Sequence, residues 1–124
     1  MSINTLPSEQ YPVLLDEKSS RLRKLFADLS APQLEVYDSP REHFRMRAEF
    51  RIWHDDGDCC YAMFEPGQKA SSKSLIRIHH LPIASKAIND LMHPLLDAVK
   101  AQELTKNRIF TIEFLSTLSV DMLV

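Results

Sequence analysis

Residues 46–54 alternate between apolar and polar side chains, which is typical of a β-strand with one buried face. Ala48, Phe50 and Ile52 fall on one face of such a strand. The opposite face carries Arg47, Glu49, Arg51 and Trp53. The next four residues, Asp-Asp-Gly-Asp at 55–58, predict a hairpin loop in which Gly57 supplies the left-handed conformation. Residues 59–64 then form the returning strand.

Three further segments have the composition of strands, and they span residues 34–37, 75–79 and 108–116. In the last of them, Phe110, Ile112 and Phe114 are predicted to share one face. A final apolar run at 120–124 begins another segment of the same kind.

Two other stretches have the three- and four-residue apolar spacing of helices. The first is predicted to start near Ser8, with Pro12 in its first turn, and its stripe comprises Leu14, Leu15, Leu22, Leu25, Phe26 and Leu29. The second is predicted to start near Ala84 or Ser85, with a kink at Pro94. Its buried stripe comprises Ile88, Leu91, Met92, Leu95, Leu96 and Val99.

Together these elements predict an α+β fold, a mainly antiparallel sheet with two helices packed on one face. We expect residues 1–124 to form a single domain. The apolar segment at 120–124 has no polar tail after it. We therefore expect the sheet to be truncated at its C-terminal strand and the chain to be a fragment of a longer protein.

Composition narrows the class of ligand. An apolar content of 44% and a charged content of 26% are those of a globular protein, and a pI near 6.2 argues against a generally basic nucleic-acid binder. Binding to a polyanion would have to come from a local patch. Residues 39–54 form such a patch, because four arginines and two glutamates give it a charge of +2 against a formal total of −2.

The side chains of this patch suit a nucleic acid. Guanidinium groups at Arg45, Arg47 and Arg51 can make forked contacts with phosphate oxygens. Trp53 and Phe110 can stack on unpaired bases, at about 1–3 kcal/mol per base. A structural alternative stays open, in which Arg47 and Arg51 pair with Glu49 and with a carboxylate of a neighbouring strand, and Phe110 belongs to the core. The basic residues of the first helix are interpreted as a solvated face.

Catalytic and metal chemistry is not expected in this chain. Two glycines cannot build a glycine-rich nucleotide loop, and the five histidines have no metal-binding spacing. The adjacent Cys59 and Cys60 are interpreted as buried strand residues rather than nucleophiles. We therefore predict no catalytic, cofactor-binding or metal-binding residue here. The absence of a targeting segment and of a membrane-length apolar run favours the cytoplasm.

The arginine-rich stretch also resembles a known family. Ser39-Pro40 followed by Phe-Arg-Met-Arg-Ala-Glu-Phe-Arg-Ile-Trp-His-Asp at 44–55 closely resembles the N-terminal region of bacterial tRNA (uracil-5-)-methyltransferases. The opening Leu-Pro-Ser-Glu-Gln-Tyr at 6–11 and the segment 110–119 are similar to the same family. The resemblance covers nearly the whole chain in the same order, and the loop at 66–74 fits it least well.

This resemblance implies a specific function. The family transfers a methyl group from S-adenosylmethionine to carbon 5 of a uridine in the tRNA T loop, using a cysteine that adds to carbon 6 and a glutamate that removes a proton. Those groups lie in the family's C-terminal part, and neither Cys59 nor Cys60 matches the nucleophile. The resemblance implies that this chain holds the T arm with the target base flipped out. Phe110 matches a stacking aromatic, and Arg51 matches a position in the RNA-facing motif.

We therefore expect a monomeric cytoplasmic protein that binds the tRNA T arm. Because the catalytic domain is expected to be missing, we predict that this chain alone neither binds S-adenosylmethionine nor methylates RNA. Two alternatives remain, a stand-alone RNA-binding module and a protein-interaction domain whose arginines form only surface ion pairs.

Overall fold

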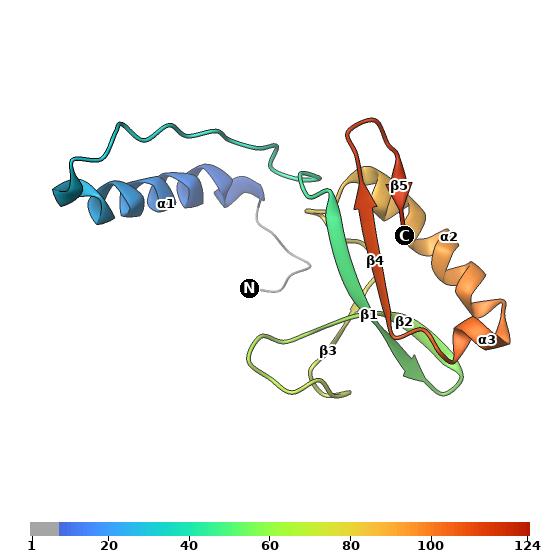
Figure 1. The fold of residues 1–124 in the computed structure, drawn as a ribbon. Coiled ribbons are helices and arrows are strands. Elements are labelled where there is room, and N and C mark those ends of the chain that lie inside the picture. Colours follow the sequence, from blue (N-terminus) through green and yellow to red (C-terminus); the bar gives the residue numbers. More distant parts are fainter. Residues whose placement is uncertain (1–7) are drawn as a thin grey trace.

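A computed structural model describes residues 8–124, which form an antiparallel sheet with a long helix across one face (Figure 1). The strand order is β3-β2-β1-β4-β5, and every neighbouring pair is antiparallel. The strands are β1 (Arg47–Asp55), β2 (Asp58–Phe64), β3 (Leu75–Ile78), β4 (Thr111–Ser116) and β5 (Met122–Leu123). The predicted α+β class with an antiparallel sheet is confirmed.

Strand β1 lies at the centre of the sheet, and its predicted alternation is confirmed. Ala48, Phe50 and Ile52 are buried, whereas Arg47, Glu49 and Arg51 are exposed. The predicted hairpin also forms. Its two turn residues, Asp56 and Gly57, both have positive φ, at 45° and 78°. This is the left-handed geometry that lets a two-residue turn follow the twist of the strands.

The core lies between the sheet and α2 (Lys86–Lys100). Phe50, Tyr61 and Phe114 meet there with ring centroids 5.2–6.0 Å apart. The hydroxyl of Tyr61 donates a hydrogen bond of 2.7 Å to the carbonyl oxygen of Met92. This bond satisfies a polar group that would otherwise be buried without a partner, and burial raises the pKa of Tyr61.

The start of α2 is fixed by a side-chain cap. The Ser85 hydroxyl accepts a hydrogen bond of 3.2 Å from the backbone N–H of Ile88, so the predicted start near Ala84 or Ser85 is confirmed, with Ser85 as the cap. The same hydroxyl lies 2.7 Å from that of Ser116 on β4. The cap therefore also joins the helix to the sheet. Pro94 lies inside the helix, which runs unbroken from Lys86 to Lys100.

The first helix differs from the expectation of two helices on one face of the sheet. Helix α1 (Tyr11–Leu25) and the extended chain that follows it project away from the sheet (Figure 1). We call residues 8–40 the arm. Helix α2, together with Leu81 and Ala84, already covers the apolar face of the sheet, and no residue of the arm belongs to the core. The four-residue helix α3 (Glu103–Lys106) follows α2.

Four other elements also differ from those predicted. Residues 34–37 are not part of the described sheet, and the last apolar run contributes only the two residues of β5. Strand β4 begins at Thr111, so Phe110 precedes it and does not share the buried face of Ile112 and Phe114. Ser8 opens a 3₁₀ turn, and Gln10 occupies the cap position of α1. Leu6 and Pro7, part of the family-like opening, lie outside the described residues.

Candidate nucleic-acid interface

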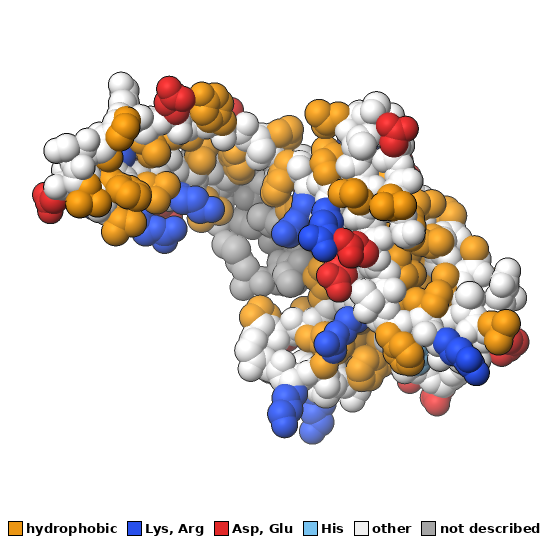
Figure 2. All heavy atoms as spheres, viewed as in Figure 1, with side chains coloured by type: hydrophobic (Ala, Val, Ile, Leu, Met, Phe, Trp, Pro, Cys, Tyr) orange, Lys and Arg blue, Asp and Glu red, His pale blue; other side chains and the backbone are white. Residues whose placement is uncertain are grey.

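The sheet face opposite α2 brings three of the five predicted RNA-binding residues together. Arg47, Arg51 and Trp53 are spaced by even numbers along β1, so they share this face. We call it the outer face. The strand pairing places further side chains of the neighbouring strands on this face, and they are Cys60, Ala62, Phe64, Arg77, Thr111, Glu113 and Leu115. Figure 2 shows basic and acidic side chains side by side over β1 and β4, with hydrophobic side chains around them.

Arg47 is held by an ion pair across the sheet. Its Nε donates a hydrogen bond to Glu113 on β4, and this contact raises the pKa of Arg47. Glu113 lies directly opposite Glu49 in the register, so Arg47 offsets a like-charge pair. The structural alternative is thus realised for Arg47. The side chains of the pair are 65% and 47% exposed, so solvent screens the pair and its contribution to stability is small. A phosphate can therefore compete for the guanidinium at little cost.

Arg51 has a different environment. Its guanidinium carbon lies 5.7 Å from the ring centroid of Phe64, and the Phe64 ring meets Trp53 edge-on at 5.9 Å. Within residues 8–124 no carboxylate pairs with Arg51. An arginine over an aromatic ring at an exposed site contributes about 0.5–1 kcal/mol, and the donors of its fork stay available. Arg51, Trp53 and Phe64 therefore form an arginine-aromatic cluster in the middle of the outer face.

Arg77 and Phe64 were not identified from the sequence. Arg77 lies on β3, where its Nη2 donates to Asp55 at 2.9 Å and its Nη1 lies 3.3 Å from the sulfur of Cys60. Its side chain adds a third arginine to the outer face and helps bury Cys60. The alternation of Ile76, Arg77 and Ile78 could have placed this arginine on the polar face, but not beside β1.

Phe110 lies at the hairpin end of the sheet and is 68% exposed, so it is not a core residue. The ring of His54 contacts it edge-on, with centroids 5.6 Å apart. His54 Nε2 donates a hydrogen bond of 2.7 Å to the carbonyl oxygen of Ile109, and the N–H of Ile52 donates one of 2.8 Å to that of Phe110. Phe110 is thus an exposed aromatic whose backbone is fixed to β1.

Arg45 lies at the other end of β1. Its backbone N–H donates to Ile83 and its carbonyl accepts from Ser85, at 2.8 Å each, so it adjoins β1 without pairing within the sheet. Its side chain is exposed and lines a groove of about 280 Å³ with Arg47. At about 3.3 Å per residue, Arg45 and Trp53 are about 26 Å apart along the strand. The five predicted residues therefore follow a track along the strand rather than lining one pocket.

The two cysteines are buried, as the sequence predicted, and both are free. Burial raises the pKa of both thiols, so the reactive thiolate is disfavoured. In the described part of the chain, no group of three His, Cys, Asp or Glu side chains is arranged to hold a metal ion. No helix within residues 8–124 has both the length and the apolar character needed to cross a membrane.

Comparison with known proteins gives a consistent result. A sequence model of the family described as tRNA (Uracil-5-)-methyltransferase matches residues 10–124. A tRNA/tmRNA (uracil-C(5))-methyltransferase of Acinetobacter baylyi is 49% identical over 117 residues, which are 94% of this chain and 32% of the relative. A protein of the same name from Neisseria meningitidis serogroup A is 55% identical over 115 residues, 92% of this chain and 32% of the relative. The chain thus spans about a third of the length of these relatives.

Proposed function

This chain belongs to the tRNA (uracil-5-)-methyltransferase family, and from that membership we propose that it recognises the tRNA T arm for methylation of a T-loop uridine. In this proposal residues 1–124 act as one cytoplasmic, monomeric RNA-binding domain. The methyl transfer itself belongs to the part of the family that has no counterpart here. This chain alone is therefore inactive.

The observation that carries the proposal is the composition of the outer face. Arg51 has an available guanidinium fork beside two aromatic rings, Phe64 and Trp53. Protein contacts to phosphates position an RNA, and aromatic or guanidinium planes stack on its unpaired bases. A single cluster that offers both contacts suits a folded RNA arm whose loop bases are unstacked.

The position of Phe110 extends this argument to the target loop. An enzyme that modifies a base inside a folded loop must extrude that base, and the gap in the stack then needs a partner. Phe110 is already exposed, and its carbonyl oxygen accepts a hydrogen bond from Ile52 on β1. His54 anchors the neighbouring residue, Ile109. A base can therefore stack on it without any loss of core packing. Arg45 and Arg47, at the far end of the track, are proposed to contact phosphates.

S-adenosylmethionine is proposed to bind outside this chain. It supplies the methyl group in the reaction of the full-length family. The described residues do not fit this cofactor, because Gly57 lies in the hairpin turn, Gly67 follows β2, and the sheet is antiparallel. The crevice at the carboxyl ends of parallel strands, where nucleotide-like cofactors bind, has no equivalent in the sheet of residues 47–123. We therefore assign no step of the methyl transfer to residues of this chain.

Binding of a T-arm hairpin at several salt concentrations tests the proposal. We expect binding whose logarithmic affinity falls linearly with the logarithm of salt, because the arginines displace counterions from phosphates. The absence of binding at every salt concentration would overturn the proposal for this chain. Methyl transfer by the purified 124-residue chain would overturn our proposal that the catalytic residues lie outside this chain.

Two other functions remain candidates. The Arg47–Glu113 pair favours a protein-interaction surface, because it lowers the free positive charge of the outer face. A stand-alone RNA-binding module would use the same face without any methyl transfer. The genomic reading frame after codon 124 separates the latter from our proposal, since an intact continuation would place this region in a longer enzyme.

A further inference from the structure

The arm has almost no core of its own. Within residues 8–40 the single buried residue is Ser19, whose hydroxyl donates to the carbonyl oxygen of Leu15 at 2.8 Å. The base of the arm is closed by Tyr11 and Ser39, since the N–H of Ser39 donates to the Tyr11 hydroxyl at 2.7 Å. These contacts hold α1 against the returning chain. They bury very little apolar surface.

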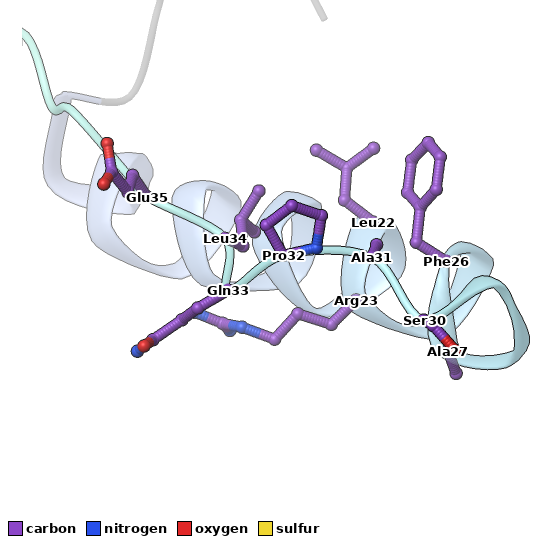
Figure 3. A pocket seen from close by; sticks show the side chains of 10 residues that line it. All are labelled: Leu22, Arg23, Phe26, Ala27, Ser30, Ala31, Pro32, Gln33, Leu34 and Glu35. Carbon is purple, nitrogen blue, oxygen red and sulfur yellow. The ribbon is translucent and has the colours of Figure 1, made fainter.

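A stripe of apolar side chains along α1 and its C-cap remains exposed, with Lys18 between its first two members. Their spacing of 0, 8, 11 and 12 residues places the four apolar side chains on one side of a helix, and they are Leu14, Leu22, Leu25 and Phe26. Leu25 is 68% exposed and Phe26 is 45% exposed. In Figure 3 Leu22 and Phe26 project side by side in one direction, whereas Arg23 and Gln33 project in the other.

The returning chain continues this apolar surface. Residues 31–34 run beside α1, and together with it they line a groove of about 680 Å³. Its apolar lining comprises Leu22, Phe26, Ala27, Ala31, Pro32 and Leu34. The stripe and the groove together form one surface, which we call the arm surface.

Such a surface is unfavourable if it stays in water. A helix of about 12–15 residues is marginal in isolation, and most helices in proteins are stabilised by burying an apolar face. Helix α1 has 15 residues and leaves that face open. Contiguous exposed apolar side chains on a soluble protein typically mark an interface.

We propose that the arm surface docks on the remaining two thirds of the family's polypeptide. The family match begins at residue 10, so α1 belongs to the region shared with relatives about three times as long. About two thirds of each relative has no counterpart in this chain, and a covalently linked partner acts at a millimolar effective concentration. The inference rests on family membership and not on T-arm binding.

The apolar chemistry of the arm surface favours this occupant over RNA. Phosphates require cations and bases require flat rings, whereas the arm surface offers mainly aliphatic side chains, with Lys18 and Arg23 as its basic residues. A second copy of this chain is the other possible occupant, and it would require association that depends on protein concentration.

The test compares this chain alone with a fusion in which the unmatched two thirds of the Neisseria meningitidis relative follows Val124. Amide hydrogen exchange is measured over residues 11–29. We expect exchange in the fusion to be slower by roughly tenfold or more. Leu25→Asp removes that slowing. The matched control Leu104→Asp changes a leucine on α3 that is 74% exposed, and it leaves the slowing intact.

Three results would overturn the proposal. The first is equal exchange in the fusion and in the chain alone. The second is a slowing of exchange in the chain alone that grows with protein concentration. The third is a slowing that only a T-arm hairpin produces. If the fusion does not fold, the two thirds is added as a separate chain, and the absence of slowing there also overturns the proposal. Failure of T-arm binding leaves this measurement unaffected, so the two proposals can fail independently.

Discussion

Arg51 on β1 places its guanidinium carbon 5.7 Å from the ring centroid of Phe64 on the neighbouring strand. Of the three arginines on the outer face, Arg47 and Arg77 each pair with a carboxylate, whereas Arg51 pairs with none in the described part of the chain. Its charge is therefore the one most available to a polyanion. This relationship ranks the arginines by their expected contribution to RNA binding.

Substitution of Arg51 should weaken RNA binding more than substitution of Arg47. We expect Arg51→Ala to lower the affinity for a T-arm hairpin by roughly tenfold and to reduce the salt slope by about one. Arg47→Ala also frees Glu113 beside Glu49, but the arginine it removes is already paired, so a smaller effect on the slope is expected. Fluorescence anisotropy titrations at several salt concentrations measure both. Equal slopes for Arg51→Ala and the unsubstituted chain would contradict this ranking.

Arg77 is expected to shield Cys60. Its Nη1 lies 3.3 Å from the Cys60 sulfur, on the face away from α2. In a Cys59→Ser background, Arg77→Ala should speed modification of Cys60 by a thiol reagent, because loss of cover outweighs loss of the nearby positive charge. Arg21→Ala, on the arm, serves as the control and leaves the rate unchanged. An unchanged rate in Arg77→Ala would show that other side chains bury the thiol.

The hydrogen bond of Tyr61 should contribute to stability. Tyr61→Phe removes the donor to the Met92 carbonyl oxygen, which keeps the backbone hydrogen bond of α2. We expect the free energy of unfolding to fall by about 0.5–1.5 kcal/mol, the net contribution of one hydrogen bond. Denaturant unfolding followed by circular dichroism measures this. A change within error of zero would mean that water replaces the lost donor.

Stability should fall in acid partly through Asp58. A hydrogen bond of 2.8 Å from Lys100 lowers the pKa of Asp58 below its ordinary value of 3.8. A lowered folded pKa means that the contribution is present above the ordinary value and is lost as pH falls through the folded value. Thermal unfolding is measured between pH 6 and about pH 2. The melting temperature of Asp58→Asn should therefore fall less in acid than that of the unsubstituted chain. Identical drops would show that the pair contributes nothing.

Local periodicity was sufficient to predict the centre of the fold. The alternation around Phe50 and the Asp-Asp-Gly-Asp turn specify the β1–β2 hairpin, because a slip of one residue would expose every core side chain. Ser85 likewise marks the start of α2 through its own side chain. These signals depend only on residues close together in the sequence, so they can be recognised without knowledge of the fold.

The remaining features depend on partners distant in the sequence. The stripe of α1 indicates an apolar face but not what covers it, so the helix was predicted and its position away from the sheet was not. Phe110 follows the alternation of β4, yet it lies just beyond the last register pair, Arg51 with Thr111, and its side chain is exposed. Phe64 and Arg77 join the candidate site only through the strand order, which no local pattern contains.

The central claim is that the outer face and Phe110 recognise the tRNA T arm. The most direct measurement compares the affinity of the unsubstituted chain, Arg51→Ala and Phe110→Ala for a T-arm hairpin and for the same stem closed by an unrelated loop. We predict that Phe110→Ala loses roughly tenfold affinity for the T arm alone, at about 1–3 kcal/mol per stacked base, whereas Arg51→Ala weakens both RNAs. Equal affinity of all three proteins for the T-arm hairpin would contradict the claim.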